Sequence, residues 1–142
     1  MAYCTQANIL GLINETSLIA LTDDDGAGAV DADKVAAAIA DADATIDSYC
    51  QGRYTIPLSP VPPKIAQLSV DIAVYNLYSR SDLEMPEVRK ERNKEAIRFL
   101  EKVAAGGISL GAETPARVDT IDDAGSMESN TRIFTRDKMR GF

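Results

Sequence analysis

The chain has 142 residues, a length that fits one domain with a short extension, and its composition of 45% hydrophobic and 26% charged residues is ordinary for a globular protein. No run of 18 or more apolar residues is present, so the sequence predicts no membrane-spanning helix and no membrane partner. The sequence contains no histidine, and it therefore lacks both the most common general base and the most common zinc ligand; we do not expect an enzyme.

The net charge of −7 is unevenly distributed along the chain. Residues 1–52 contain nine acidic residues and one basic residue, whereas residues 132–142 contain four basic residues and one acidic residue. An acidic body would repel phosphates, so we expect no specific nucleic-acid partner. The basic end is better suited to contact an acidic surface on another protein.

The start of the chain has neither the basic nor the apolar stretch of a signal peptide, so we expect synthesis and folding in the cytoplasm. In that reducing compartment Cys4 and Cys50 are expected to remain without a disulfide, and Cys50 is predicted to be a small buried apolar residue.

Apolar spacing predicts two short helices near the N-terminus, at residues 6–13 and 15–21, with Thr5 as the N-cap of the first and Asn14 as the break between them. The residues expected to be buried in them are Ile9, Leu10, Leu12, Ile13, Leu18, Ile19 and Leu21. Residues 22–30 then form a loop rich in Asp and Gly.

A long helix is predicted over residues 32–51, capped by Asp31 or Asp33 and ended by Gly52 in the left-handed conformation. Its apolar residues recur at spacings of three and four, which is the period of a helix with one buried face. These residues are Val35, Ile39, Ala42, Ile46 and Tyr49, and the acidic residues expected on the solvated side are Asp41, Asp43 and Asp47.

Two further long helices are predicted, over residues 63–80 and 87–104. The first is apolar nearly all round and should be the central helix, whereas the second has a strongly charged outer face. The inner face of the second is predicted to consist of Val88, Ala96, Phe99, Leu100 and Val103.

The segment between the first two long helices contains four prolines within residues 57–63. Proline forbids both helix interior and central strand, so this segment should be a rigid extended connector that fixes the angle between the helices. The residues predicted to form this structural hinge are Gly52, Arg53, Tyr54, Pro57 and Pro62.

The sequence changes character after Gly106 and Gly107, where the helical period is lost. We therefore predict an all-α domain at residues 1–106, a compact bundle of three long and two short helices, followed by an extended C-terminal arm at residues 107–142. Scattered apolar and basic side chains suggest that the arm becomes ordered on another protein. The residues predicted to make that contact are Arg132, Ile133, Phe134, Arg136, Met139, Arg140 and Phe142.

Three stretches carry a resemblance to a known family: Tyr3-Cys4-Thr5-Gln6-Ala7-Asn8-Ile9-Leu10, the run from Ile46 through Gly52-Arg53-Tyr54 to Leu58, and the terminal run from Arg132 to Phe142. In these stretches the chain resembles the Mu-like phage and prophage family of small virion proteins. That family is similar in architecture to the head–tail connector (adaptor) proteins of long-tailed phages.

The resemblance implies a structural subunit of the phage neck, assembled in the bacterial host cytoplasm and located in the virion. Copies would form a ring that joins portal and capsid to the tail. The implied partners are other copies of the chain, the portal protein and a tail-completion or tail-terminator protein. The resemblance carries over no catalytic residue.

Two alternatives remain from the residues themselves. The run Asp23-Asp24-Asp25 resembles the start of a calcium-binding loop, but its twelfth position is Lys34, where a bidentate Glu is needed, so neither a metal nor another cofactor is expected. The two short helices could instead form the helix-turn-helix of a small phage regulatory or DNA-binding protein, but their acidic surroundings argue against that function.

Overall fold

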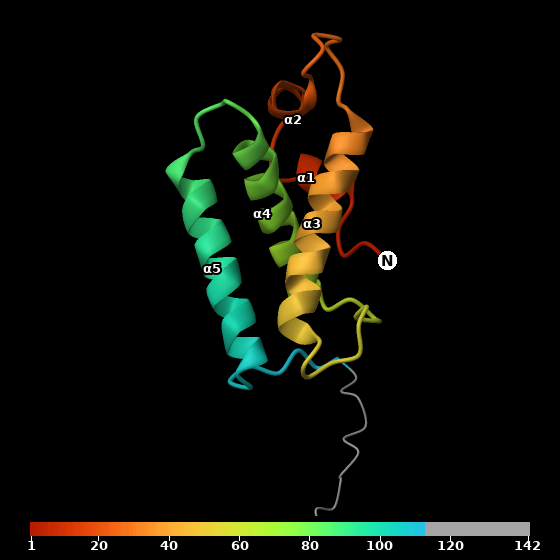
Figure 1. Ribbon diagram of the computed structural model, residues 1–142, viewed down its shortest axis with the longest axis vertical. Coiled ribbons are helices and arrows are strands. Elements are labelled where there is room, and N and C mark those ends of the chain that lie inside the picture. The colour runs from red at the N-terminus through yellow and green to blue at the C-terminus, as the bar shows by residue number, and fades with distance from the viewer. Residues whose placement is uncertain (113–142) are drawn as a thin grey trace, which may run out of the picture.

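In the computed structural model, which describes residues 1–112, the chain folds into five α-helices without a β-strand in that range (Figure 1). This confirms the predicted all-α class, with three long and two short helices. The helices are α1 (Gln6–Leu10), α2 (Glu15–Thr22), α3 (Ala32–Cys50), α4 (Pro63–Arg80) and α5 (Glu87–Ala104). None of these helices is long and apolar enough to cross a membrane.

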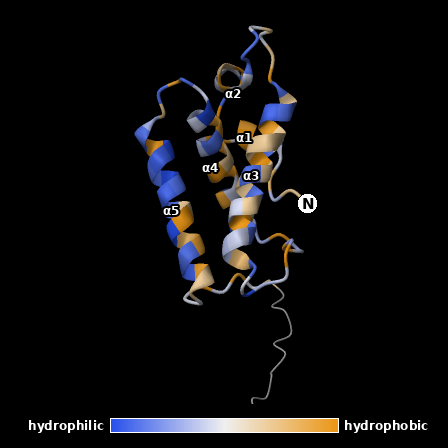
Figure 2. Cartoon of the chain, in the orientation of Figure 1, coloured by the Kyte–Doolittle hydropathy of each residue, from blue (hydrophilic) through white to orange (hydrophobic). Residues whose placement is uncertain are grey.

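Helix α4 lies at the centre of the bundle and contacts all four other helices, while α3 and α5 flank it and also contact each other. Figure 2 shows that the apolar residues of the three long helices face one another and that the outer side of α5 is hydrophilic. The sequence prediction of a central helix at 63–80 is confirmed. The buried residues of α4 are Ile65, Leu68, Ser69, Val70, Ile72, Ala73, Val74 and Leu77.

Polar side chains begin the first three helices. Thr5 caps α1 in a capping box with Asn8, and Asp31 caps α3 by accepting from the backbone N–H groups of Asp33 and Lys34. Asn14, predicted only as a break, is the N-cap of α2, because its side chain accepts from the N–H of Ser17.

The predicted left-handed cap at Gly52 is wrong. Gly52 does not have a positive φ angle, and the chain passes instead through a tight turn that extends the helical bonding beyond α3. In this turn the N–H groups of Arg53 and Tyr54 both donate to the carbonyl of Cys50, at 2.9 Å each.

Two residues predicted to be buried are exposed. Leu10 is 39% exposed, because α1 is a single turn that directs Ile9 into the core and leaves its neighbour outside. Val88 is 64% exposed, and it lies in the first turn of α5, where the buried residues of that helix have not yet begun. Leu12 and Ile19 are only partly buried.

Candidate assembly surface

A partly buried polar network fastens the N-terminal segment to the bundle; we call it the N-terminal clasp, formed by Tyr3, Asp43, Asp47 and Ser69. The Tyr3 N–H donates to Asp43 Oδ2 at 3.1 Å, and the Tyr3 hydroxyl donates to Asp47 Oδ1. The same hydroxyl accepts from the buried N–H of Leu58 at 3.0 Å. Ser69 of α4 donates to Asp43 Oδ1 at 2.9 Å. The clasp therefore joins the N-terminal segment, α3, α4 and the proline-rich segment.

Burial also changes the acid–base properties of the clasp. It is the main cause that raises the pKa of the Asp43 carboxyl, although bonds from Ser69 and Tyr3 act in the opposite direction. Burial, followed by the bond to Asp47, raises the pKa of the Tyr3 phenol. The phenol is therefore neutral at physiological pH and is able to donate its proton to Asp47.

The expectation that Asp43 and Asp47 are simply solvated is wrong: both are partly buried and accept hydrogen bonds, whereas Asp41 is exposed as predicted. A spacing of four places Asp43 and Asp47 on one side of α3, next to the buried stripe that contains Ile39 and Ile46. That position at the border of an apolar stripe was the available indication of a structural role.

We expect Tyr3→Phe to lower the free energy of unfolding by about 1–3 kcal/mol, since it removes the hydroxyl and leaves the buried N–H of Leu58 without its acceptor. Urea unfolding measures this change. Tyr78→Phe, on a half-buried tyrosine of α4, is the matched control and should have a smaller effect. Equal stability of Tyr3→Phe and the wild type would mean that the clasp contributes nothing.

The five predicted hinge residues lie at the end of the bundle where α3 ends and α4 begins. Gly52 and Pro57 are exposed, Arg53 and Pro62 are partly buried, and Tyr54 is buried. Pro62 directly precedes α4, whose first residue is Pro63, as predicted. The peptide bonds Ile56–Pro57 and Ser59–Pro60 are cis. Whether the segment acts as a hinge remains a prediction.

Tyr54 holds the segment that follows α5 against the bundle; we call this contact the Tyr54 anchor. The Tyr54 side chain is 2% exposed, and its hydroxyl accepts from the N–H of Leu110 at 3.0 Å. Ile108, Leu110 and Ala112 pack partly against the core. The predicted arm therefore begins as a segment held to the bundle over residues 107–112.

Glycine is required at the turn that precedes this segment. Gly106 has a φ of 86°, and a Cβ atom there would lie 1.9 Å from Nη1 of Arg53. The guanidinium of Arg53 thus occupies the space beside Gly106. This close approach brings the turn that follows α5 next to the turn that follows α3, beside the Tyr54 anchor.

A charged cluster holds the opposite end of the bundle. Asp24 pairs with Lys34 of α3 at 2.8 Å and with Arg80 of α4 at 2.6 Å, and Arg80 also donates to the carbonyl of Leu21 at 2.8 Å. Bonds from Arg80 and then from Lys34 hold the pKa of Asp24 at about 2. The loop that resembles a calcium-binding start is therefore held by basic side chains.

This cluster predicts a pH dependence of stability. The pKa of Asp24 is lower in the folded chain than its ordinary value near 3.9, so its contribution to stability is present above about pH 4 and is lost as the pH falls toward 2. Urea unfolding between pH 5 and 2 should show a stability difference between wild type and Asp24→Asn that shrinks with falling pH. Asp25→Asn, at the exposed neighbouring residue, is the control. A difference that does not vary with pH would contradict this interpretation.

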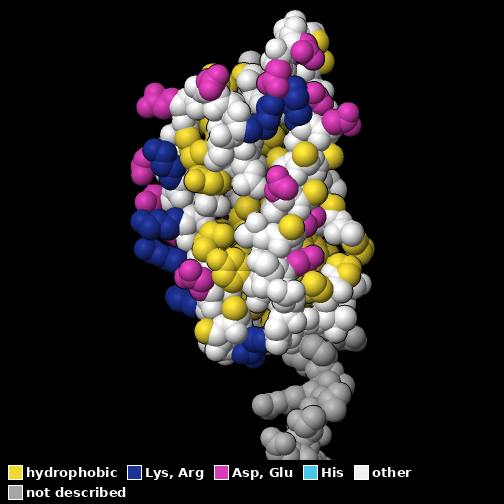
Figure 3. All heavy atoms as spheres, viewed as in Figure 1, with side chains coloured by type: hydrophobic (Ala, Val, Ile, Leu, Met, Phe, Trp, Pro, Cys, Tyr) yellow, Lys and Arg dark blue, Asp and Glu magenta, His cyan; other side chains and the backbone are white. Residues whose placement is uncertain are grey.

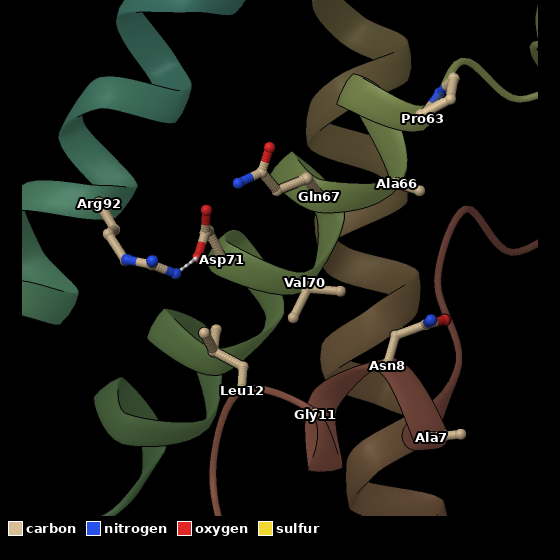
Figure 4. A pocket seen from close by; sticks show the side chains of 10 residues that line it. All are labelled: Ala7, Asn8, Gly11, Leu12, Pro63, Ala66, Gln67, Val70, Asp71 and Arg92. Atoms are coloured by element: carbon tan, nitrogen blue, oxygen red, sulfur yellow. Dashed lines mark hydrogen bonds and ion pairs between the residues drawn. The ribbon is translucent and has the colours of Figure 1, made fainter.

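Several grooves open on the surface of the described residues, and two of them include residues of the first 12 positions. One, of about 540 Å³, lies between α1, α4 and α5, and its charged lining residues, Asp71 and Arg92, pair with each other at 3.0 Å (Figure 4). The other, of about 460 Å³, lies between the N-terminal segment and the outer side of α3; we call it the α3 groove. It is lined by Met1, Ala2, Ala36, Ile39, Ala40, Asp43, Ala44 and Asp47.

Basic and acidic residues are unevenly distributed among the helices. Lys and Arg side chains occur mainly on α4 and α5, and Figure 3 shows them along the α5 edge together with acidic residues. The N-terminal half, through α3, carries the acidic excess. The predicted contact residues of the arm, from Arg132 to Phe142, lie outside the described residues.

Comparison with known proteins gives a consistent result. Residues 3–129 match the family model described as "Bacteriophage Mu, Gp36". The Mu-like prophage FluMu protein gp36 of Haemophilus influenzae is 36% identical over 82% of this chain and 80% of its own length. Gene product J of Escherichia phage Mu is 29% identical over 100% of this chain and 99% of its own length.

The resemblance inferred from the three sequence stretches is thereby confirmed at the level of the family. Two of those stretches meet in the fold, since Tyr3 from the first contacts Asp47 and Leu58 from the second. With most of its length matched by one family model, the chain belongs to the Mu-like phage family described as Bacteriophage Mu, Gp36.

Proposed function

We propose that this protein is a structural, non-enzymatic subunit of the head–tail connector, or neck, of a tailed-phage or prophage particle. In this proposal copies of the chain form a ring that joins the portal and capsid to the tail. The ring contacts the portal protein on one side and a tail-completion or tail-terminator protein on the other. DNA passes through the ring without being recognised by sequence.

The observation that carries the proposal is the Tyr54 anchor. A subunit that contacts a neighbour through an extension needs the base of that extension to be held in place on its own body. The hydrogen bond from the Leu110 N–H to the Tyr54 hydroxyl holds the segment after α5 on the helical bundle in this way. The 30 residues of the sequence after Ala112 end in a basic run with apolar side chains. Such a run is suited to contact an acidic protein surface.

The packing of the helical bundle gives further support to the proposal. The three long helices share one core, and the described side-chain nitrogen and oxygen atoms that are buried all have hydrogen-bond partners. Such a body is expected to keep its shape on assembly, so that association is determined by surface charge and by the extension. Membership of a phage family is consistent with this role.

Native mass spectrometry of the subunit mixed with the portal protein of the same phage tests the proposal. We expect a complex of one portal ring with a closed set of subunits. The matched control is the portal mixed with the Gly106→Val variant, in which the added side chain would displace Arg53 beside the Tyr54 anchor; it should bind more weakly. Absence of any complex with the wild-type chain would count against the connector role.

A further inference from the structure

The α3 groove combines an apolar floor with acidic surroundings. Its floor is formed by the small side chains of Ala36, Ala40 and Ala44, and Ile39 lies at its inner edge. The carboxylates of Asp43 and Asp47 form part of its wall. The exposed Asp33, seven positions before Ala40, lies on the same side of α3 as the groove alanines. A segment that binds here must therefore supply apolar side chains and positive charge.

The part of the chain that lines the groove, the N-terminal segment and α3, contains few basic residues. In residues 1–52 the basic side chain is Lys34, which pairs with Asp24 and Asp31 at 2.8 and 3.1 Å, and the other cation is the N-terminal ammonium group. Two bodies of this charge approaching through their α3 sides would repel each other. Assembly of copies through this surface needs a basic element between them.

The sequence of the same chain contains such an element. Residues 132–142 carry Arg132, Arg136, Lys138 and Arg140 against one Asp, together with Ile133, Phe134, Met139 and Phe142. The groove volume of about 460 Å³ is enough for one or two large apolar side chains. The apolar side chains of residues 132–142 (the tip) thus match the apolar floor of the groove, and their basic side chains match its acidic surroundings.

The length of the chain permits the contact. Helix α3 has 19 residues and is therefore about 28 Å long. Residues 113–131, between the described body and the tip, could span at most about 60–70 Å when fully extended. The tip is thus able to reach the α3 side of an adjacent copy.

We propose that the α3 groove is the receptor for residues 132–142 of a second copy of the chain. Apolar tip side chains insert between the N-terminal segment and the alanines of α3, and the tip arginines face the carboxylates. Placing the tip on a second copy rests on the proposed ring, because binding in the same chain would not link subunits. Each subunit then gives its tip to one neighbour and receives that of another, the head-to-tail contact that closes a ring.

Disulfide trapping in the full-length chain tests this inference. The variant Ala40→Cys with Thr135→Cys is oxidised in two preparations: concentrated purified protein and purified phage particles. The control places the first cysteine at Ala20, an exposed alanine of α2 outside the groove. The native Cys4 and Cys50 are buried and should not compete.

We expect a ladder of covalent multimers with Ala40→Cys and little with the Ala20→Cys control. Added salt should weaken the ladder, since the Debye length falls from about 10 Å at 0.1 M to about 3 Å at 1 M. An internally bridged monomer instead of a ladder would overturn the choice of a second copy. Equal ladders from both variants, or no ladder in particles that contain the subunit, would overturn the groove as the receptor.

The two preparations separate this inference from the proposed function. Particles that contain the subunit at the neck but give no ladder contradict the groove contact and leave the connector role intact. Particles that lack the subunit contradict the connector role, even if the purified chain forms the ladder.

Discussion

Deletion of residues 130–142 is expected to prevent heads from joining tails while leaving the helical body folded. Burial of a large apolar side chain contributes about 1.5–3 kcal/mol, so losing Phe134, Met139 and Phe142 together should weaken the subunit contact by more than about a hundredfold. The measurement is electron microscopy of particles from a phage that lacks the gene and is complemented with either chain. Free heads and free tails should accumulate with the shortened chain.

A control separates loss of assembly from loss of folding. The shortened chain should unfold at nearly the same temperature as the full chain, because the deletion removes none of the buried core residues of the bundle, which run from Tyr3 to Val103. Complete phage at wild-type yield from the shortened chain would refute the role assigned to the arm.

Replacement of Tyr54 by alanine is expected to have the largest effect on stability of the changes discussed. The side chain is 2% exposed and is among the largest fully buried ones, so its removal should lower the free energy of unfolding by about 3–5 kcal/mol. It would also remove the acceptor for the N–H of Leu110. Thermal or urea unfolding measures the change.

Tyr54→Phe is the informative partner of that variant. It keeps the ring in the core and removes only the hydroxyl, so we expect a loss of about 1 kcal/mol. Hydrogen exchange at Leu110 should nevertheless become much faster, since the segment after α5 loses its anchor. Unchanged exchange at Leu110 would show that the Tyr54 anchor does not hold this segment.

The long helices could be predicted from sequence because several local indications agree at each end. Helix α4 begins at Pro63, a residue suited to the first helical position, and α5 stops just before Gly106, which needs a positive φ angle. The apolar period then fixes the buried face of α3. Agreement of this kind leaves few alternative folds.

The errors occurred where tertiary contacts decide the outcome. Gly52 is a helix-ending residue by local preference, yet the bonds to Cys50 continue the turn without a positive φ angle. Val88 fits the apolar period of α5, but it is exposed in the first turn of that helix, at the end of the bundle. Neither effect can be read from the spacing of residues in one helix.

The candidate site was predicted less well than the fold. Asp43 and Asp47 look like ordinary solvated residues of an acidic helix, because the partner that buries them, Tyr3, is 40 or more positions away. The hydroxyl of Tyr54 likewise meets Leu110 across 56 positions. Such pairings depend on how the helices pack, and the sequence predicted only that the segments involved were distinctive.

Electron microscopy of complete particles that carry a gold-labelled subunit tests the central claim most directly. A short peptide tag inserted in the exposed turn at residues 82–84 provides the label without touching the core. If the protein is a neck subunit, gold should be found at the junction between head and tail in nearly every labelled particle. Gold at the capsid surface, at the tail tip, or absent from purified particles would contradict the account.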